Sequence, residues 1–270
     1  HDIPTRWSEL RLDIPVWFNY LFLTNGRSPD IREQERLTQN FQVPRYKVAR
    51  QGMIGAVRRP SGTRIASGEL TRYRLAMEDV PAIKEEAFIT TLDDYRASLK
   101  LQLQSIEMPQ EPVEQVLSSW PELAKDLLEA SYYGQQFTKR RHQKQLMEAL
   151  EPHLPADGTK SEKALAAYYY LQQTMEWDGS YRYSAREDVL EYFKKKIASS
   201  GELNLMLLTV LRALGIESYP VMLSTRSHGK MIQLYPIIRQ FNHTVIVARL
   251  NEQLLVLDLS DDERPAGVPR

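Results

Sequence analysis

The chain has 270 residues, of which 42% are hydrophobic and 26% charged, so it can bury the core of one large domain or of two modest ones. Its 35 basic and 35 acidic residues cancel, and this balance gives no reason to expect nucleic acid or an anionic membrane as a partner. The absence of cysteine excludes disulfides, thiolate metal sites and thiol catalysis together.

Residues 1–109 are predicted to form a β-rich domain. Residues 69–77 and 95–106 alternate between two faces with the period of a strand, which predicts an antiparallel sheet with one solvated face. Residues 46–57 are a third strand candidate. We expect these strands to form part of a sandwich. Residues 24–44 are polar and without a period, so we interpret them as a mobile loop.

The composition changes at residues 108–112, where two prolines flank polar residues, and we place the domain boundary between residues 109 and 110. Beyond it the apolar residues recur with helical spacing. Four helices are predicted, at 113–130, 139–154, 161–176 and 186–198. His142 lies in the basic cluster of residues 139–142, which we interpret as a solvated helix face.

The strongest predicted element is a helix over residues 202–214. It is apolar nearly all round, which is typical of a helix buried inside a domain. Ser199 and Glu202 have the spacing of a capping box at its start, and Gly215 fits a C-terminal stop. Strands are predicted after it, at 218–223, 244–250 and 254–259, the last two as a hairpin. Helices followed by an antiparallel sheet indicate an α+β fold rather than an alternating βαβ fold.

The run from Leu211 to Ile216 reads Leu-Arg-Ala-Leu-Gly-Ile. It resembles the phrase that closes the nucleophile helix of transglutaminase-like (papain-like) proteins. The family spacing leads back from this phrase to Ser200, where the family has its catalytic cysteine. The resemblance also places the family histidine at His243 and the family aspartate at Asp258, 15 residues later. It implies a core at 110–270 in which a buried central helix packs on an antiparallel sheet.

The chain is also similar to envelope proteins of the Bacteroidetes type that carry a β domain of unknown function before a transglutaminase-like core. Phrases at 79–86, 223–226 and 264–267 carry this resemblance. It implies a periplasmic or envelope-associated protein whose leader is absent from this chain, and a chain that continues on both sides. The longest apolar run, near 203–214, is too short to span a bilayer.

Serine in place of cysteine changes the chemistry. The N–H groups at a helix start stabilise a thiolate, whereas a hydroxyl needs a base that removes its proton during attack and an oxyanion hole. Ser200, His243 and Asp258 supply the residue types of a serine triad. The alternatives are structural. Ser200 caps its helix, His243 is a core histidine bonded to Asp258, and Asp258 binds a turn.

Four further residues are expected near the resulting cleft: Trp177, Ser199, Glu202 and Asn242. Trp177 could donate its indole N–H there or pack as an ordinary aromatic. His228 is interpreted as an exposed loop residue. The five histidines show no ligand spacing, so we expect no metal and no cofactor.

Three functions are therefore considered. The first is an inactive transglutaminase-like protein that keeps a cleft for a peptide or a protein partner at the cell envelope. The second is an active serine-type peptidase or amidase that uses Ser200, His243 and Asp258. The third is a structural module of a larger envelope protein, with the cleft filled by its own side chains.

Overall fold

The computed structural model describes residues 3–50, 56–84, 91–109, 111–261, 263 and 265–268. The chain divides into two compact units, His1–Leu117 and Ser118–Arg270. The predicted boundary at 109/110 falls earlier than this division, because the short strand that follows it pairs within the first unit. Part of the predicted strand 46–57 and parts of the phrases at 79–86 and 264–267 lie outside the described residues.

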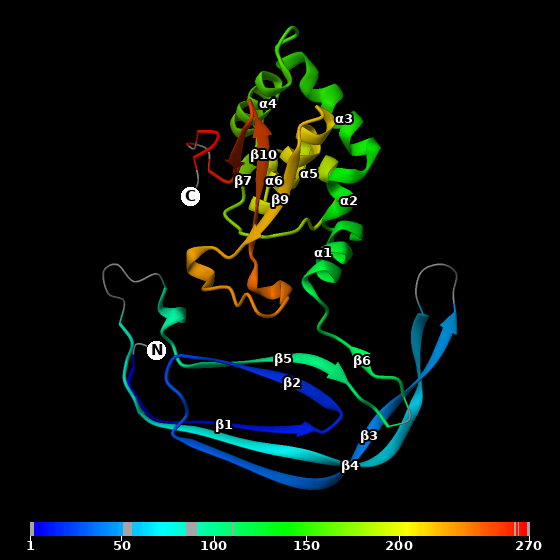
Figure 1. Ribbon diagram of the computed structural model, residues 1–270, viewed down its shortest axis with the longest axis vertical. Helices are drawn as coiled ribbons and strands as arrows, with labels where there is room; N and C mark the ends of the chain where they lie inside the picture. The colour runs from blue at the N-terminus through cyan, green and yellow to red at the C-terminus, as the bar shows by residue number, and fades with distance from the viewer. Residues whose placement is uncertain are drawn as a thin grey trace. The chain divides into compact units, whose positions relative to one another are not determined.

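The first unit contains two antiparallel three-stranded sheets (Figure 1). One sheet has the order β1-β4-β3, with strands Thr5–Pro15, Ala56–Val80 and Ile31–Arg50. The other has the order β2-β5-β6, with strands Phe18–Asn25, Ser98–Ile106 and Glu114–Gln115. The strand predicted at 69–77 is confirmed as part of β4, and the strand predicted at 95–106 is confirmed from Ser98 onward as β5.

The loop predicted at 24–44 is wrong. From Ile31 onward these residues belong to β3, which pairs with β4 along most of its length (Figure 1). Most β3 side chains whose burial is described are exposed. A strand that buries neither face needs no apolar alternation, so its sequence gives no period-2 signal. The ladder of backbone hydrogen bonds to β4 holds it in place.

The second unit contains the helices. They are α1 (Trp120–Glu129), α2 (Gly134–Thr138), α3 (Arg140–Leu150), α4 (Lys160–Thr174), α5 (Val189–Lys195) and α6 (Ser200–Ala213). Each predicted helix overlaps one of these, but α2 was missed because five residues are too few to show helical periodicity. Within the described ranges, no helix combines the length and the apolarity needed to cross a membrane.

Helix α6 lies against a sheet of order β11-β10-β9 (Figure 1). The strands are β9 (Ser218–Leu223), β10 (His243–Leu250) and β11 (Gln253–Leu257). Every residue from Ser200 to Leu211 is buried. The predicted hairpin is confirmed, with Asn251 and Glu252 at φ 47° and 63° in its two-residue turn. The expected α+β class, with a buried helix packed on an antiparallel sheet, is therefore confirmed.

His142 is not on a solvated helix face, because its side chain is only 1% exposed. Its Nδ1 lies 2.7 Å from the Gln136 carbonyl oxygen and its Nε2 lies 2.8 Å from the Asp188 carboxylate. The ring is therefore held by a polar partner at each of its two nitrogens. The basic neighbours of His142 in sequence hid this burial, since the contact with Asp188 is made across 46 positions of the chain.

Gln136 joins the helices around this histidine. Its side-chain oxygen accepts from the Val189 backbone N–H at 2.8 Å, and its amide nitrogen donates to the Ser131 carbonyl at 2.6 Å. Gln136 is itself buried. Two backbone groups of other segments therefore depend on one side chain for a hydrogen-bond partner.

We expect Gln136→Met to destabilise the protein by about 2–4 kcal/mol, because a similar volume remains while Val189 N–H and Ser131 C=O lose their partner. Urea unfolding measures this change. Gln173→Met on the exposed face of α4 is the control, with an expected change below about 0.5 kcal/mol. Equal effects of the two substitutions would contradict the role given to Gln136.

Candidate active site

Ser200, His243 and Asp258 lie in one hydrogen-bonded chain, which we call the relay. The Ser200 Oγ is 2.9 Å from His243 Nδ1, and His243 Nε2 is 2.9 Å from Asp258 Oδ2. Three elements bring them together: the first turn of α6, the first residue of β10 and the segment directly after β11. The packing of α6 on this sheet thus brings together residues that are far apart in the sequence. Ser200 and Asp258, the most distant pair, are separated by 58 positions.

The Asp258 carboxylate is held from its other side as well. Its Oδ1 accepts from Asn204 Nδ2 at 2.8 Å, from the Ser260 backbone N–H at 3.0 Å and from the Ser260 hydroxyl at 2.7 Å. Burial alone would raise the pKa of Asp258, but hydrogen bonds from His243, Asn204 and Ser260 outweigh it and hold this pKa well below its usual range. The ionised carboxylate can only accept a hydrogen bond, so His243 Nε2 carries hydrogen. In the neutral ring, Nδ1 then accepts a hydrogen bond from the Ser200 hydroxyl.

Asn204 was missed by the sequence analysis. It lies one turn after Ser200 on α6 and is fully buried. Its amide nitrogen also donates to the Thr244 carbonyl at 2.8 Å, and its oxygen accepts from the Leu259 backbone N–H at 2.8 Å. The available signal was a lone amide within an otherwise apolar helix, since a buried polar side chain requires partners.

A backbone segment, Ser180–Tyr183, covers the start of α6, and we call it the covering segment. The Arg182 backbone N–H donates to Ser200 Oγ at 3.1 Å, and the Ser200 backbone N–H donates to the Ser180 carbonyl at 3.1 Å. The Tyr183 carbonyl accepts from Thr244 Oγ1 at 2.8 Å. Under this cover Ser200 is 0% exposed, as against 1% for His243 and 4% for Asp258.

Gly201 shows how closely the covering segment approaches. A Cβ at this position would lie 2.2 Å from the Arg182 carbonyl oxygen, a distance that non-bonded atoms do not tolerate. The second residue of the helix must therefore lack a side chain for the Arg182 backbone to reach Ser200. The contact is thus encoded in the sequence, by a glycine whose role the helix pattern does not reveal.

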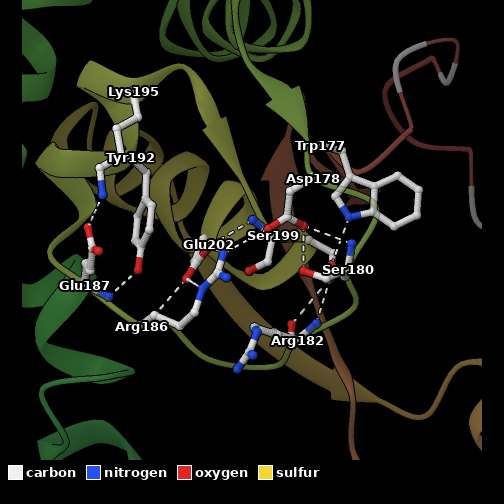
Figure 2. A network of polar contacts seen from close by, with 11 residues as sticks. Trp177, Asp178, Ser180, Arg182, Arg186, Glu187, Tyr192, Lys195, Ser199 and Glu202 are labelled. Atoms are coloured by element: carbon white, nitrogen blue, oxygen red, sulfur yellow. Dashed lines mark hydrogen bonds and ion pairs between the residues drawn. The ribbon is translucent and has the colours of Figure 1, made fainter.

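Glu202 fixes the same helix start from a second direction (Figure 2). Its carboxylate accepts from the Ser199 backbone N–H at 2.8 Å, as the capping-box spacing predicts. Arg186 binds both carboxylate oxygens at 3.0 Å and also contacts Asp178 at 2.9 Å. Burial would raise the pKa of Glu202, but hydrogen bonds from Arg186 and Ser199 lower it to about 2.

Of the four residues expected to line a cleft, Ser199 and Glu202 are buried in this packed helix start. Trp177 and Asn242 are half-buried. Trp177 donates its indole N–H to the Ser180 carbonyl at 2.9 Å, so it supports the covering segment (Figure 2). Asn242 exchanges two hydrogen bonds of 2.8 Å with Thr225.

Tyr181 links Trp177 to the relay. Its ring centroid lies 5.0 Å from that of Trp177 and 5.3 Å from that of His243, the second pair at an edge-to-face angle of 79°. The covering segment therefore contacts the histidine of the relay as well as its serine.

His228, by contrast, lies in an exposed 3-10 turn, as the sequence suggested. Among the described residues, no three His, Cys, Asp or Glu side chains gather as metal ligands would.

Residues 149–252 match the family model of the transglutaminase-like superfamily. The matched range includes Ser200 and His243 and ends before Asp258. No curated protein matches the sequence.

Two solved structures match this chain over nearly its full length. One is a "putative protease" from Parabacteroides distasonis, with a TM-score of 0.52 and 11% identity over 97% of this chain. The chain spans 45% of the length of that protein. The other is a "putative cysteine protease" from Cytophaga hutchinsonii, with a TM-score of 0.34 and 13% identity over 96% of this chain and 80% of that one. At such identity the first likeness describes the fold alone.

The buried Glu202 gives the domain a measurable pH dependence. Because its folded pKa is about 2, below the ordinary value of 4.5, its ionised form stabilises the protein above pH 4.5. This contribution, about 3 kcal/mol at most, is lost as the pH falls from 4.5 toward 2. Urea unfolding between pH 6 and pH 2.5 should show a smaller loss in Glu202→Gln than in the parent protein.

Glu162 provides the matched control, since it occupies the same capping position at the exposed start of α4. We expect Glu162→Gln to leave the pH dependence nearly unchanged, because the exposed carboxylate is screened by water. Parallel pH curves for the parent protein and Glu202→Gln would contradict the assignment.

Proposed function

We propose that this chain is a catalytically silent transglutaminase-like protein that binds a peptide or protein partner at the bacterial cell envelope. The observation that carries the proposal is the complete burial of the Ser200 hydroxyl beneath the backbone of the covering segment. The relay then acts as a structural pin that joins α6 to β10 and to the residues after β11.

The geometry that acyl transfer requires supports the absence of catalysis by Ser200. A nucleophile needs a substrate carbonyl within about 3 Å and donors aimed at the oxyanion that forms there. The space beside Ser200 Oγ holds the Arg182 backbone, whose N–H and carbonyl oxygen lie 3.1 Å and 3.4 Å from that atom. The Ser200 N–H already donates to Ser180.

The residue type points the same way. The field at the start of α6 would stabilise a thiolate, but it is too weak to ionise a serine hydroxyl. A buried serine at this position instead gains a second role as a small hydrogen-bonding group, donating to His243 and accepting from Arg182. Both contacts are as compatible with a structural role for Ser200 as with a nucleophilic one.

The expected peptide cleft at the helix start is filled by the chain's own backbone. This favours a purely structural role for the start of α6, so a partner would have to bind at another surface. Tyr219, Val221 and Leu254 are exposed apolar side chains on the outer face of the β11-β10-β9 sheet. Exposed apolar residues on one sheet face suit contact with another protein chain. The envelope location rests on the resemblance to Bacteroidetes-type proteins.

A serine-type peptidase or amidase is the second candidate. It is favoured by the 2.9 Å contact between Ser200 and His243 and by an ionised Asp258 behind the imidazole. In that case the covering segment must move away from Ser200 before substrate enters.

Labelling with a fluorophosphonate reagent distinguishes the two functions. We expect the folded chain to show no more labelling than its Ser200→Ala variant, because the hydroxyl is inaccessible. Intact-mass spectrometry measures the adduct. Stoichiometric labelling that disappears in Ser200→Ala would support the hydrolase and end the silent reading.

A thiol reporter tests the burial itself. The chain contains no cysteine, so Ser200→Cys carries a single thiol. We expect iodoacetamide to modify it at least about 100-fold more slowly than Ser227→Cys, whose position is exposed, and at a similar rate once both are unfolded in urea. Similar rates in the folded proteins, with the fold retained, would contradict the proposal, as would amidase activity in Ser200→Cys.

A further inference from the structure

The first unit contains a cavity of about 550 Å³ that the relay does not explain. This volume lies within the range of about 300–1,000 Å³ that is usual for small-molecule sites. The wall combines residues of both sheets with the turn that joins them. The lining residues are Ile14, Pro15, Val16, Phe18, Asn19, Tyr20, Phe22, Thr71, Tyr73, Gln104, Ser105, Glu107 and Gln115.

A β-bulge shapes this wall. Asn19 pairs with Ser105 and the next residue, Tyr20, pairs with Leu103, so Gln104 has no partner across the ladder. Gln104 and Ser105, although adjacent in sequence, both line the cavity. The Gln104 carbonyl accepts backbone N–H bonds of 2.9 and 3.0 Å from residues 116 and 117, which hold the bulge in place. Bulges commonly redirect side chains beside binding sites.

The polar groups of the wall are partly arranged in advance. Asn19 Nδ2 donates to Ser105 Oγ at 2.9 Å and to Glu107 Oε1 at 2.7 Å. The side-chain amides of Gln104 and Gln115, in contrast, form no hydrogen bond with any described part of the chain. Two amides that line a cavity therefore retain their donors and acceptors for a bound molecule.

Aromatic rings form the rest of the lining. Phe22 of β2 and Tyr73 of β4 contact across the two sheets, with ring centroids 4.9 Å apart and an interplanar angle of 48°. Tyr20 and Phe18 lie on the same strand as Phe22, and all of these rings are half-buried. Their flat, apolar faces can pack against the C–H faces of a ligand.

The charges indicate which ligand fits. The described residues that line the cavity include no lysine, arginine or histidine, which argues against phosphate or carboxylate ligands. The one carboxylate, Glu107, already accepts from Asn19. Amide and hydroxyl groups beside aromatic rings match a neutral molecule that carries many hydroxyl groups. We propose that this cavity is a binding site for a neutral oligosaccharide.

Isothermal titration of the full chain with maltotriose, cellotriose and tri-N-acetylchitotriose tests the proposal. We expect saturable binding of at least one, weakened at least tenfold in a variant that combines Gln104→Ala and Gln115→Ala, because each lost neutral hydrogen bond weakens binding about fivefold. Gln39→Ala, in the exposed part of β3 and outside the cavity, is the control and should bind like the parent chain. Thermal unfolding checks that each variant folds.

Glu107→Gln separates a sugar site from a site for cations. A neutral sugar should bind this variant within about threefold of the parent affinity, since the amide oxygen can still accept from Asn19. Failure of all three sugars to bind would overturn the proposal, and so would sugar binding that the double variant leaves unchanged. Binding of spermidine that Glu107→Gln abolishes, without sugar binding, would assign the cavity to cations. None of these results depends on the reactivity of Ser200.

Discussion

The burial of the start of α6 is the constraint on which the rest of the second unit depends. The first N–H groups of a helix have no partner within the helix, and here no water can reach them. The protein satisfies two of them with its own groups, as the Glu202 carboxylate accepts from Ser199 and the Ser180 carbonyl accepts from Ser200. Arg186 then neutralises Glu202. The covering segment is thus required by helix burial, whatever the function of Ser200.

The same constraint explains how a complete Ser-His-Asp arrangement can be compatible with a lack of catalytic activity. Hydrogen bonds satisfy every member of the relay, and fully satisfied buried polar networks rigidify a core. Such a network specifies which strand end meets which helix turn. The geometry that a hydrolase would use therefore also fixes the position of α6 relative to β10 and to the residues after β11.

The sequence predicted the features that depend on local pattern. The apolar helix and the hairpin after it were correct, because one continuous core imposes their periodicity. The sequence did not reveal contacts made by backbone or across long separations. Arg182 reaches Ser200 through its backbone N–H, and the helix pattern does not reveal this contact, although Gly201 is needed for it. His142 is buried because Asp188 meets it, and β3 is a strand because β4 pairs with it.

Amide hydrogen exchange at Arg182 tests the central claim most directly. This N–H lies outside helices and strands, yet it donates to the buried Ser200 hydroxyl. We predict that it exchanges at least about 1,000-fold more slowly than an open loop amide, as buried hydrogen bonds do, while the exposed Gly179 exchanges freely. Rapid exchange of the Arg182 amide in the folded protein would mean that the covering segment opens readily, and it would contradict the sealed relay.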